Sequence, residues 1–153
     1  MRVLIIGDVV GRPGRRALTE LLPGLVSETG ANFVIVNGEN AAGGAGITRE
    51  TAAPLYAAGA HVLTMGNHVW GQRDGYSFLQ EETRVVRPGN FPAGAPGRGA
   101  YVYETAEGVH VGVINLQGRT FMQAIDDPFR AGDALIAGIT GEADCIFVDF
   151  HAE

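Results

Sequence analysis

The sequence predicts an α/β fold with a mixed β-sheet, and three observations carry this prediction. Four short β-rich runs are apolar on consecutive residues, which is typical of strands covered on both faces. Helical patterns separate the first three runs, and this alternation indicates a parallel sheet with right-handed crossovers. A hairpin pattern precedes the fourth run, so part of the sheet is expected to be antiparallel.

The chain has the length and composition of one globular domain. It contains 153 residues, of which 46% are hydrophobic and 18% charged, with 23 glycines. Such a chain can bury a real core, so we assign residues 1–153 to a single domain. The four strands are expected at 2–8, 32–40, 61–68 and 144–151.

The first helix is expected between residues 12 and 30. Apolar side chains recur there at helical spacing: Ala17, Leu18, Leu21, Leu22, Leu25 and Val26. Pro13 suits the first turn and Gly30 marks the end. Pro23 lies inside the pattern and is expected to kink or split the helix.

Two further helices are expected at 48–60 and 127–142. Thr48 is a good N-cap for the first of them, and Gly59 is a good stop. Between these helices, residues 83–99 follow a short possible strand and are rich in loop-forming residues. Residues 100–117 form the hairpin pattern, with a turn near Glu107 and Gly108.

Charge and composition exclude several classes of function. The net charge of −6 argues against a broad nucleic-acid surface, which needs a basic footprint. Arg12, Arg15 and Arg16 form a basic cluster, for which a solvated helix start is favoured over a phosphate contact. The sequence shows neither a membrane-length apolar run nor a secretory signal. A single cysteine, Cys145, fits a cytoplasmic location, and its apolar surroundings favour a buried thiol over a reactive one.

Polar side chains stand at the carboxyl ends of the predicted strands. In an open α/β sheet, ligands bind outside these ends. The residues concerned are Asp8, Glu39, Asn40, Asn67, His68 and His151. Taken singly, each has a structural explanation as a cap, a turn residue or a core histidine. Taken together at one edge of one sheet, they favour a site.

Carboxylate, carboxamide and imidazole groups suit a metal centre. The set holds no thiolate, which excludes a structural zinc knot. It suits Mn, Fe, Zn, Ni or Co better than calcium. Glu39 is placed to bridge two ions, and a pair of ions about 3.5–4 Å apart can polarise a phosphoryl oxygen and activate a water molecule. Such ions would also attract an anionic substrate to an acidic protein.

Three motifs in order, "GDVVGRPGR", "NGENAAGGAGIT" and "TMGNHVW", resemble those of the YmdB-like branch of calcineurin-like metallophosphoesterases. The resemblance covers essentially the whole chain. It implies a β-sandwich flanked by helices, with two metal ions at one edge. It also implies a phosphodiesterase that acts on cyclic nucleotides, with 2′,3′-cyclic nucleotides favoured, and a small phosphate ester as the binding partner.

The resemblance also implies a role for each residue of the set. Asp8 and Asn40 bind one ion, Glu39 bridges both, and Asn67 and His151 bind the other; Fe or Mn is favoured and Zn is possible. His68 is then the proton donor beside the leaving ribose oxygen, while a metal-activated hydroxide attacks phosphorus from the opposite side. A histidine suits this task because it titrates near working pH.

The sequence departs from the family pattern after His151. The family supplies two further histidines in a G-x-H-x-H stretch, whereas this sequence ends at "DFHAE". His61 and His110 do not replace them, because neither ends a strand at the predicted edge. We therefore expect the N-terminal portion of a metallophosphoesterase domain, incomplete at its C-terminus. An exposed sheet edge or face would then favour a homo-oligomer.

Two other functions stay open at this point. One is a regulatory protein that binds a phosphate or nucleotide ligand with little catalysis, and the other is a metal-free nucleotide-binding module. The substrate-binding residues are unknown from sequence. Arg119, Phe121 and Phe129 are candidates for a pocket wall, but a core position is favoured for the two aromatics.

Overall fold

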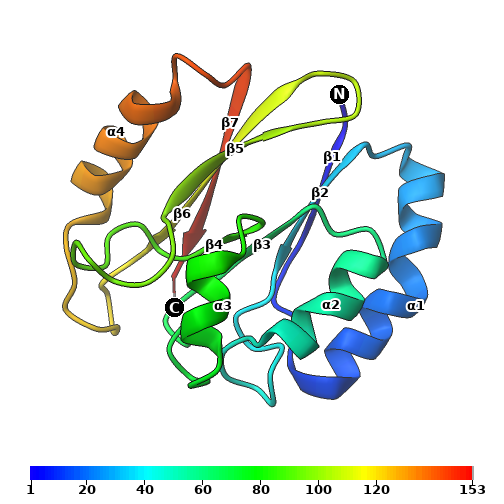
Figure 1. The fold of residues 1–153 in the computed structure, drawn as a ribbon, viewed down its shortest axis with the longest axis horizontal. Helices are drawn as coiled ribbons and strands as arrows, with labels where there is room; N and C mark the ends of the chain where they lie inside the picture. Colours follow the sequence, from blue (N-terminus) through cyan, green and yellow to red (C-terminus); the bar gives the residue numbers. More distant parts are fainter. Residues whose placement is uncertain (153) are drawn as a thin grey trace.

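Residues 1–152 are described by a computed structural model, and they form two β-sheets stacked between helices (Figure 1). The first sheet is parallel, in the order β1 (Val3–Ile6), β2 (Phe33–Asn37), β3 (Val62–Thr64) and β4 (Val85–Val86). In the second sheet, β6 (His110–Gln117) pairs antiparallel with β5 (Ala100–Glu104) and parallel with β7 (Cys145–His151). The predicted α/β class and the sandwich are confirmed.

The expectation of one mixed sheet is wrong in one respect. The fourth predicted strand, β7, joins β6 in the second sheet and does not extend the first. Stacking the sheets buries the inner face of each: Phe33, Ile35 and Val62 pack with Val111 and Val113. Two separate sheets thus achieve a shared core that one flat sheet could not form.

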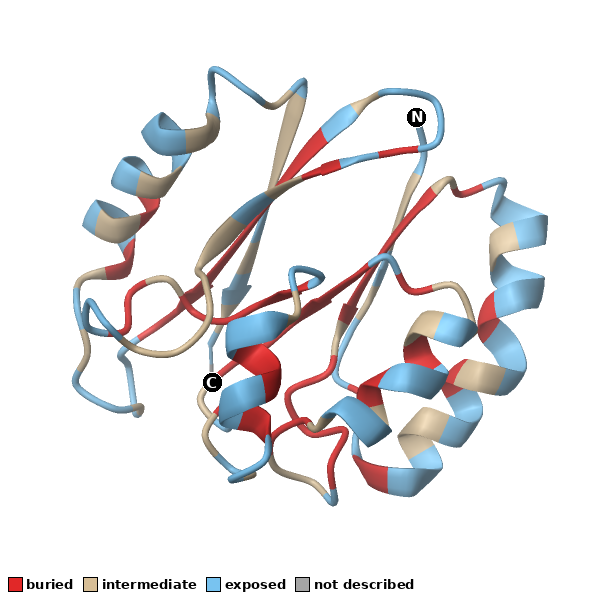
Figure 2. Cartoon of the chain, viewed as in Figure 1, coloured by how far each residue is buried: buried red, intermediate tan, exposed pale blue. Residues whose placement is uncertain are grey.

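The helices cover the two outer faces of the sandwich. The elements are α1 (Gly11–Thr29), α2 (Arg49–Ala57), α3 (Gly75–Glu81) and α4 (Pro128–Ile139). Helices α1, α2 and α3 pack on the first sheet, where Leu22, Leu55 and Leu79 are fully buried, and α4 packs on β6 (Figure 2). Because β2 lies between this helical layer and the second sheet, Phe33 through Val36 are all buried. This arrangement explains the consecutive apolar pattern of its sequence.

Local capping follows the predicted chemistry. Thr48 and Thr51 form a capping box at the start of α2. Asp127 caps α4, since its Oδ1 accepts from the backbone N–H groups of Phe129 and Arg130.

Pro23 does not split α1, which is continuous over 19 residues. Proline removes a single hydrogen bond, and the packing of Leu22 on the sheet offsets that loss. Helix α3 was not expected from the sequence.

Several predicted core positions are at the surface. Phe121 is 97% exposed and Phe129 is 73% exposed, so the core positions favoured for both are wrong. Phe121 lies in the loop between β6 and α4, and Phe129 lies in the first turn of α4. Cys145 is half-buried at the start of β7. Across residues 1–152, every helix is too short or too polar to cross a membrane.

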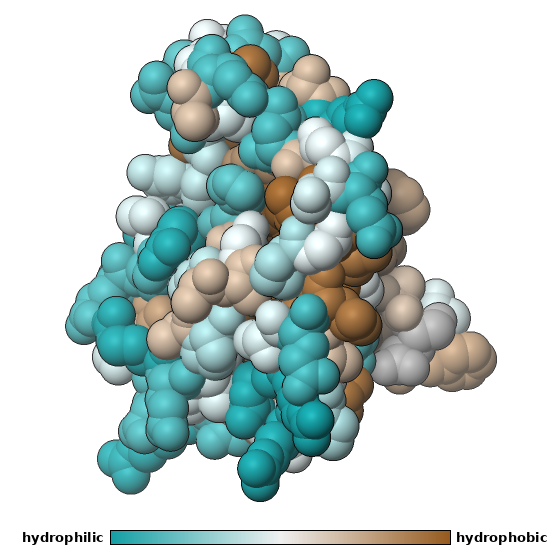
Figure 3. All heavy atoms as spheres, turned by 90° about the vertical axis from the view of Figure 1, so that its right-hand side faces the viewer, coloured by the Kyte–Doolittle hydropathy of each residue, from teal (hydrophilic) through white to brown (hydrophobic). Residues whose placement is uncertain are grey.

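One face of the molecule carries exposed apolar side chains. Figure 3 views the side occupied by α1 and shows a band of apolar atoms running down it. Ile5 in β1 is 60% exposed and Leu21 in α1 is 62% exposed. β1 is also an edge strand, paired only with β2. The sequence places its exposed edge beside the strand of His151, not at β1, so this band does not test that expectation, and the homo-oligomer stays a prediction.

Candidate metal centre

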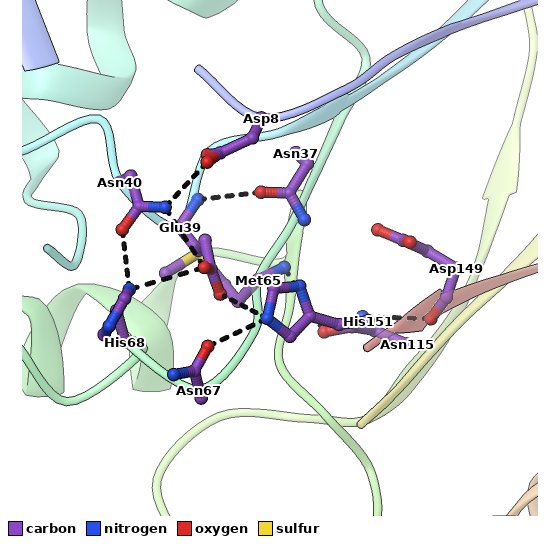
Figure 4. A network of polar contacts seen from close by, with 10 residues as sticks. All are labelled: Asp8, Asn37, Glu39, Asn40, Met65, Asn67, His68, Asn115, Asp149 and His151. Carbon is purple, nitrogen blue, oxygen red and sulfur yellow. Dashed lines mark hydrogen bonds and ion pairs between the residues drawn. The ribbon is translucent and has the colours of Figure 1, made fainter. Parts of the chain in front are cut away.

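The six predicted site residues converge at one edge of the sandwich (Figure 4). The strands end earlier than expected, so most of these residues lie in the loops that follow. Asp8 follows β1, Glu39 and Asn40 follow β2, Asn67 and His68 follow β3, and His151 ends β7. A hollow of about 400 Å³ is lined by five of the six, and Asn67 contacts His151 beside it.

Glu39 is the centre of this cluster. Its side chain is only 3% exposed, and its Oε1 lies 3.1 Å from Nδ2 of Asn40 and 3.4 Å from Nδ1 of His68. Its Oε2 lies 3.5 Å from Nε2 of His151 and has no hydrogen-bond partner within residues 1–152. Burial raises the pKa of Glu39, and the imidazoles of His151 and His68 offset only part of this effect. The carboxylate is thus held where an uncompensated charge is costly.

Asn40 connects the cluster to Asp8 and His68. Its Nδ2 donates to Oδ2 of Asp8 at 2.8 Å and to Glu39. This fixes the orientation of the amide, so its Oδ1 faces Nδ1 of His68 at 2.8 Å. Because a carboxamide oxygen only accepts, Nδ1 of His68 carries the hydrogen. The ring is therefore held at one nitrogen, while the His68 side chain stays 45% exposed.

His151 reaches the cluster from the second sheet. Its Nε2 lies 2.8 Å from Oδ1 of Asn67. The expectation that all strand ends lie at one edge of one sheet is therefore wrong for His151. The residues meet because the two sheets stack with the carboxyl ends of β2, β3 and β7 at the same end of the sandwich (Figure 4).

Gly66 makes this close approach possible. A Cβ at this position would overlap Oε2 of Glu39 and lie 2.6 Å from Cδ2 and Cε1 of His151. Only glycine lets the loop after β3 pass between a carboxylate and an imidazole at this distance. Sequence reasoning missed Gly66, although the glycine directly before "NH" in "TMGNH" was the available signal.

Two carboxamides, the half-buried Asn37 and the buried Asn115, also escaped sequence reasoning. Asn37 accepts from the backbone N–H of Glu39 at 3.3 Å through its Oδ1. Asn115, inside β6, contacts the backbone of Met65 and Asp149. Nothing in the local pattern distinguishes these asparagines from others, because their partners are distant in the chain or belong to a turn.

The remaining basic and histidine residues lie outside the cluster. Arg16 pairs with Glu20 at the surface, as expected for a solvated helix start. Arg15 instead donates to the carbonyl of Ala41, directly after Asn40. His61 accepts from the backbone N–H of Val34, and His110 lies 3.6 Å from Asp144, so neither substitutes for a ligand at this edge.

A second hollow adjoins the cluster. It has a volume of about 580 Å³ and contains Arg119 and Phe129. It shares Phe150 and Ala152 with the hollow around Glu39. The rings of Phe129 and Phe150 are 5.9 Å apart. A pocket-wall position thus fits Arg119 and Phe129, whereas Phe121 does not line this hollow.

The donor set fits metal ions, provided that carboxamides take part. Within residues 1–152, no group of three His, Cys, Asp or Glu side chains gathers closely enough to hold an ion. The oxygens of Asn40 and Asn67 would therefore have to complete the ligand sets. The unpartnered Oε2 of Glu39 supports this fit, because a buried carboxylate oxygen requires a hydrogen-bond donor or a cation.

Comparison with known proteins identifies the family. The sequence profile described as YmdB-like protein matches residues 4–153. The chain belongs to the YmdB-like family. It is 48% identical over 153 residues to the 2′,3′-cyclic-nucleotide 2′-phosphodiesterase of Bacillus subtilis (strain 168), covering 100% of this chain and 58% of that protein.

Two solved structures share the fold of this chain. A hypothetical protein from Thermus thermophilus matches with a TM-score of 0.91 and 42% identity, over 100% of this chain and 58% of that one. A novel phosphatase from Mycoplasma pneumoniae matches with a TM-score of 0.89 and 32% identity, over 99% and 55%. The chain thus spans little more than half the length of these relatives.

Proposed function

We propose that the protein is a metal-dependent phosphodiesterase that hydrolyses cyclic nucleotides, with 2′,3′-cyclic nucleotides favoured. The observation that carries this proposal is the convergence of five other polar side chains around the buried carboxylate of Glu39. The printed function of the Bacillus subtilis relative supports the same substrate class.

Two ions would be held by the residues around Glu39. Asp8 and Asn40 would hold one ion, Asn67 and His151 the other, and Glu39 both; Fe or Mn is favoured, and Zn is possible. The two oxygens of Glu39 support a bridging role, because Oε1 faces Asn40 and Oε2 faces His151. When bound, such ions supply Lewis acidity to a phosphoryl oxygen and lower the pKa of water.

His68 would donate the proton to the leaving oxygen. Its Nδ1 is held by Oδ1 of Asn40, which orients the ring and leaves Nε2 free to face a substrate. A general acid must lie within hydrogen-bond reach of the leaving oxygen, and the position of His68 in the lining of the hollow, with an exposed side chain, supports this role. Asn40 would thus both bind an ion and orient the acid.

A metal-replete activity panel tests the proposal. The substrates are 2′,3′- and 3′,5′-cyclic nucleotides, phosphomonoesters and bis-p-nitrophenyl phosphate, each assayed after chelation and after addition of Mn²⁺, Fe²⁺ or Zn²⁺. We expect metal-dependent hydrolysis, fastest with the 2′,3′-cyclic nucleotides. Binding of metal and phosphate without turnover would indicate a regulatory binding protein, and a protein that takes up no metal would refute the proposed centre.

A cytoplasmic location and a homo-oligomeric state stay predictions. The single cysteine supports the first, and the apolar band on α1 and β1 supports the second. Fractionation and light scattering of the natural protein would test them.

A further inference from the structure

A buried carboxamide links the two halves of the candidate metal centre. Asn115 lies in β6 and is fully buried. Its Oδ1 accepts from the backbone N–H of Met65 at 3.2 Å, and its Nδ2 donates to the backbone carbonyl of Asp149 at 3.1 Å (Figure 4). One side chain thus joins the loop after β3, which belongs to the first sheet, to β7 in the second sheet.

The two anchoring points lie close in the chain to proposed ligands. Met65 begins the loop that carries Asn67, and Asp149 precedes His151 by two residues in β7. Asn67 and His151 are themselves in contact at 2.8 Å. The Asn115 bonds therefore connect the backbones from which these two ligand side chains extend.

The link does not use any proposed ligand side chain. The contacts of His151 with Asn67 and Glu39 use the atoms that would bind ions, so those contacts compete with metal binding. The apolar packing between the sheets resists separation, but it is non-directional and tolerates small shifts. Hydrogen bonds from a buried carboxamide are directional, and breaking them leaves buried backbone groups unpaired.

We propose that Asn115 is a positioning residue that holds the Asn67 loop and the His151 strand in register for the second metal ion. This inference rests on the proposed function, because it requires that Asn67 and His151 share an ion. Groups that orient metal ligands typically contribute about 10–100-fold to metal affinity. Asn115 would act on the backbone behind the ligands rather than on the ligands themselves.

Asn115→Leu removes both hydrogen bonds and retains a side chain of similar size. Asn90→Leu is the matched control, since Asn90 is also a buried carboxamide with backbone partners, binding Gln117 and Asp126. Mn²⁺ affinity and stoichiometry would be measured by calorimetry on the complete natural protein, with thermal unfolding as a check on folding. Electron paramagnetic resonance would distinguish an exchange-coupled Mn pair from isolated ions.

We expect Asn115→Leu to keep one tight ion, to bind the second about 10–100-fold more weakly and to lose the coupled signal. Asn90→Leu should keep both ions at a comparable loss of stability. If Asn115→Leu does not fold, the smaller change Asn115→Ser should show the same selective loss. Unchanged binding of both ions in the folded Asn115 variant, or an equal loss in Asn90→Leu, would overturn the inference. A wild-type protein that binds no metal would instead refute the proposed function itself.

Discussion

Nε2 of His151 lies 2.8 Å from Oδ1 of Asn67, although 84 residues separate the two in the chain. The contact joins the loop after β3 to the last residue of β7, and therefore joins the two sheets. His151 also lies beside Glu39, with its Nε2 3.5 Å from Oε2 of the carboxylate. The candidate site is thus a product of sheet stacking, and its ligands depend on the relative position of the sheets.

His68→Ala should abolish most of the hydrolysis and leave metal binding largely intact. A positioned general acid contributes about 10²–10⁴-fold to the rate, so the loss of turnover number should fall in that range. Steady-state kinetics and metal analysis on the same preparation would measure both effects. His110→Ala is the control, because His110 is exposed and lies beside Asp144, away from the cluster. Loss of metal in the His68 variant would show that His68 is a ligand.

Glu39→Gln should stabilise the metal-free protein and prevent tight metal binding. The buried carboxylate has an unpartnered oxygen, and removing its charge should recover about 1–3 kcal/mol of unfolding free energy. Urea unfolding at pH 7 with a chelator would measure this change. Glu20→Gln, at the surface pair with Arg16, should change stability little. A Glu39→Gln variant less stable than the wild type would argue against a carboxylate kept for binding cations.

Gly66→Ala should disrupt the site through crowding. The added Cβ would overlap Oε2 of Glu39, and relief of that overlap requires the loop to shift, at a cost of about 1–3 kcal/mol. The melting temperature and the metal content of the variant should both be lower than those of the wild type. Gly138→Ala in α4 is the control, because a Cβ there meets no atom within 4 Å, so it should leave stability unchanged or raise it. Equal behaviour of the two variants would show that the contact at Gly66 is unimportant.

Tyr103 should make stability fall at alkaline pH. Burial raises the pKa of its hydroxyl group, which donates to the carbonyl of Thr83 at 2.8 Å. A raised folded-state pKa means that the contribution to stability is complete below the unfolded pKa of about 10 and is lost as pH rises through the folded pKa.

Tyr103→Phe should therefore lose about 1 kcal/mol at pH 7, through the lost hydrogen bond, but decline less steeply above pH 10. Urea unfolding at pH 7, 9 and 10.5 would compare the unfolding free energies of the wild type and the Tyr103→Phe variant. Parallel loss of stability in both at alkaline pH would contradict this account.

The strands and their polar ends could be predicted because local pattern encodes them. The apolar run of β2 reflects burial on both faces, and Thr48 caps α2 as its side chain predicts. The set of candidate ligands also followed from sequence, since each one comes at or just after the end of an apolar run. The core positions favoured for Phe121, in a loop, and Phe129, at the start of α4, are wrong because hydrophobicity alone does not show whether a side chain meets the core.

The sequence by itself determined most of the strands and helices, with α3 as an exception, and which polar residues would follow the strands. Only the tertiary structure decided that β7 belongs to the second sheet, that Gly66 passes between Glu39 and His151, and that Asn115 joins the sheets. The physical reason is the distance along the chain over which each kind of interaction acts. Backbone preference and side-chain periodicity act over a few residues, whereas strand partners and buried hydrogen bonds depend on packing between segments far apart in the chain.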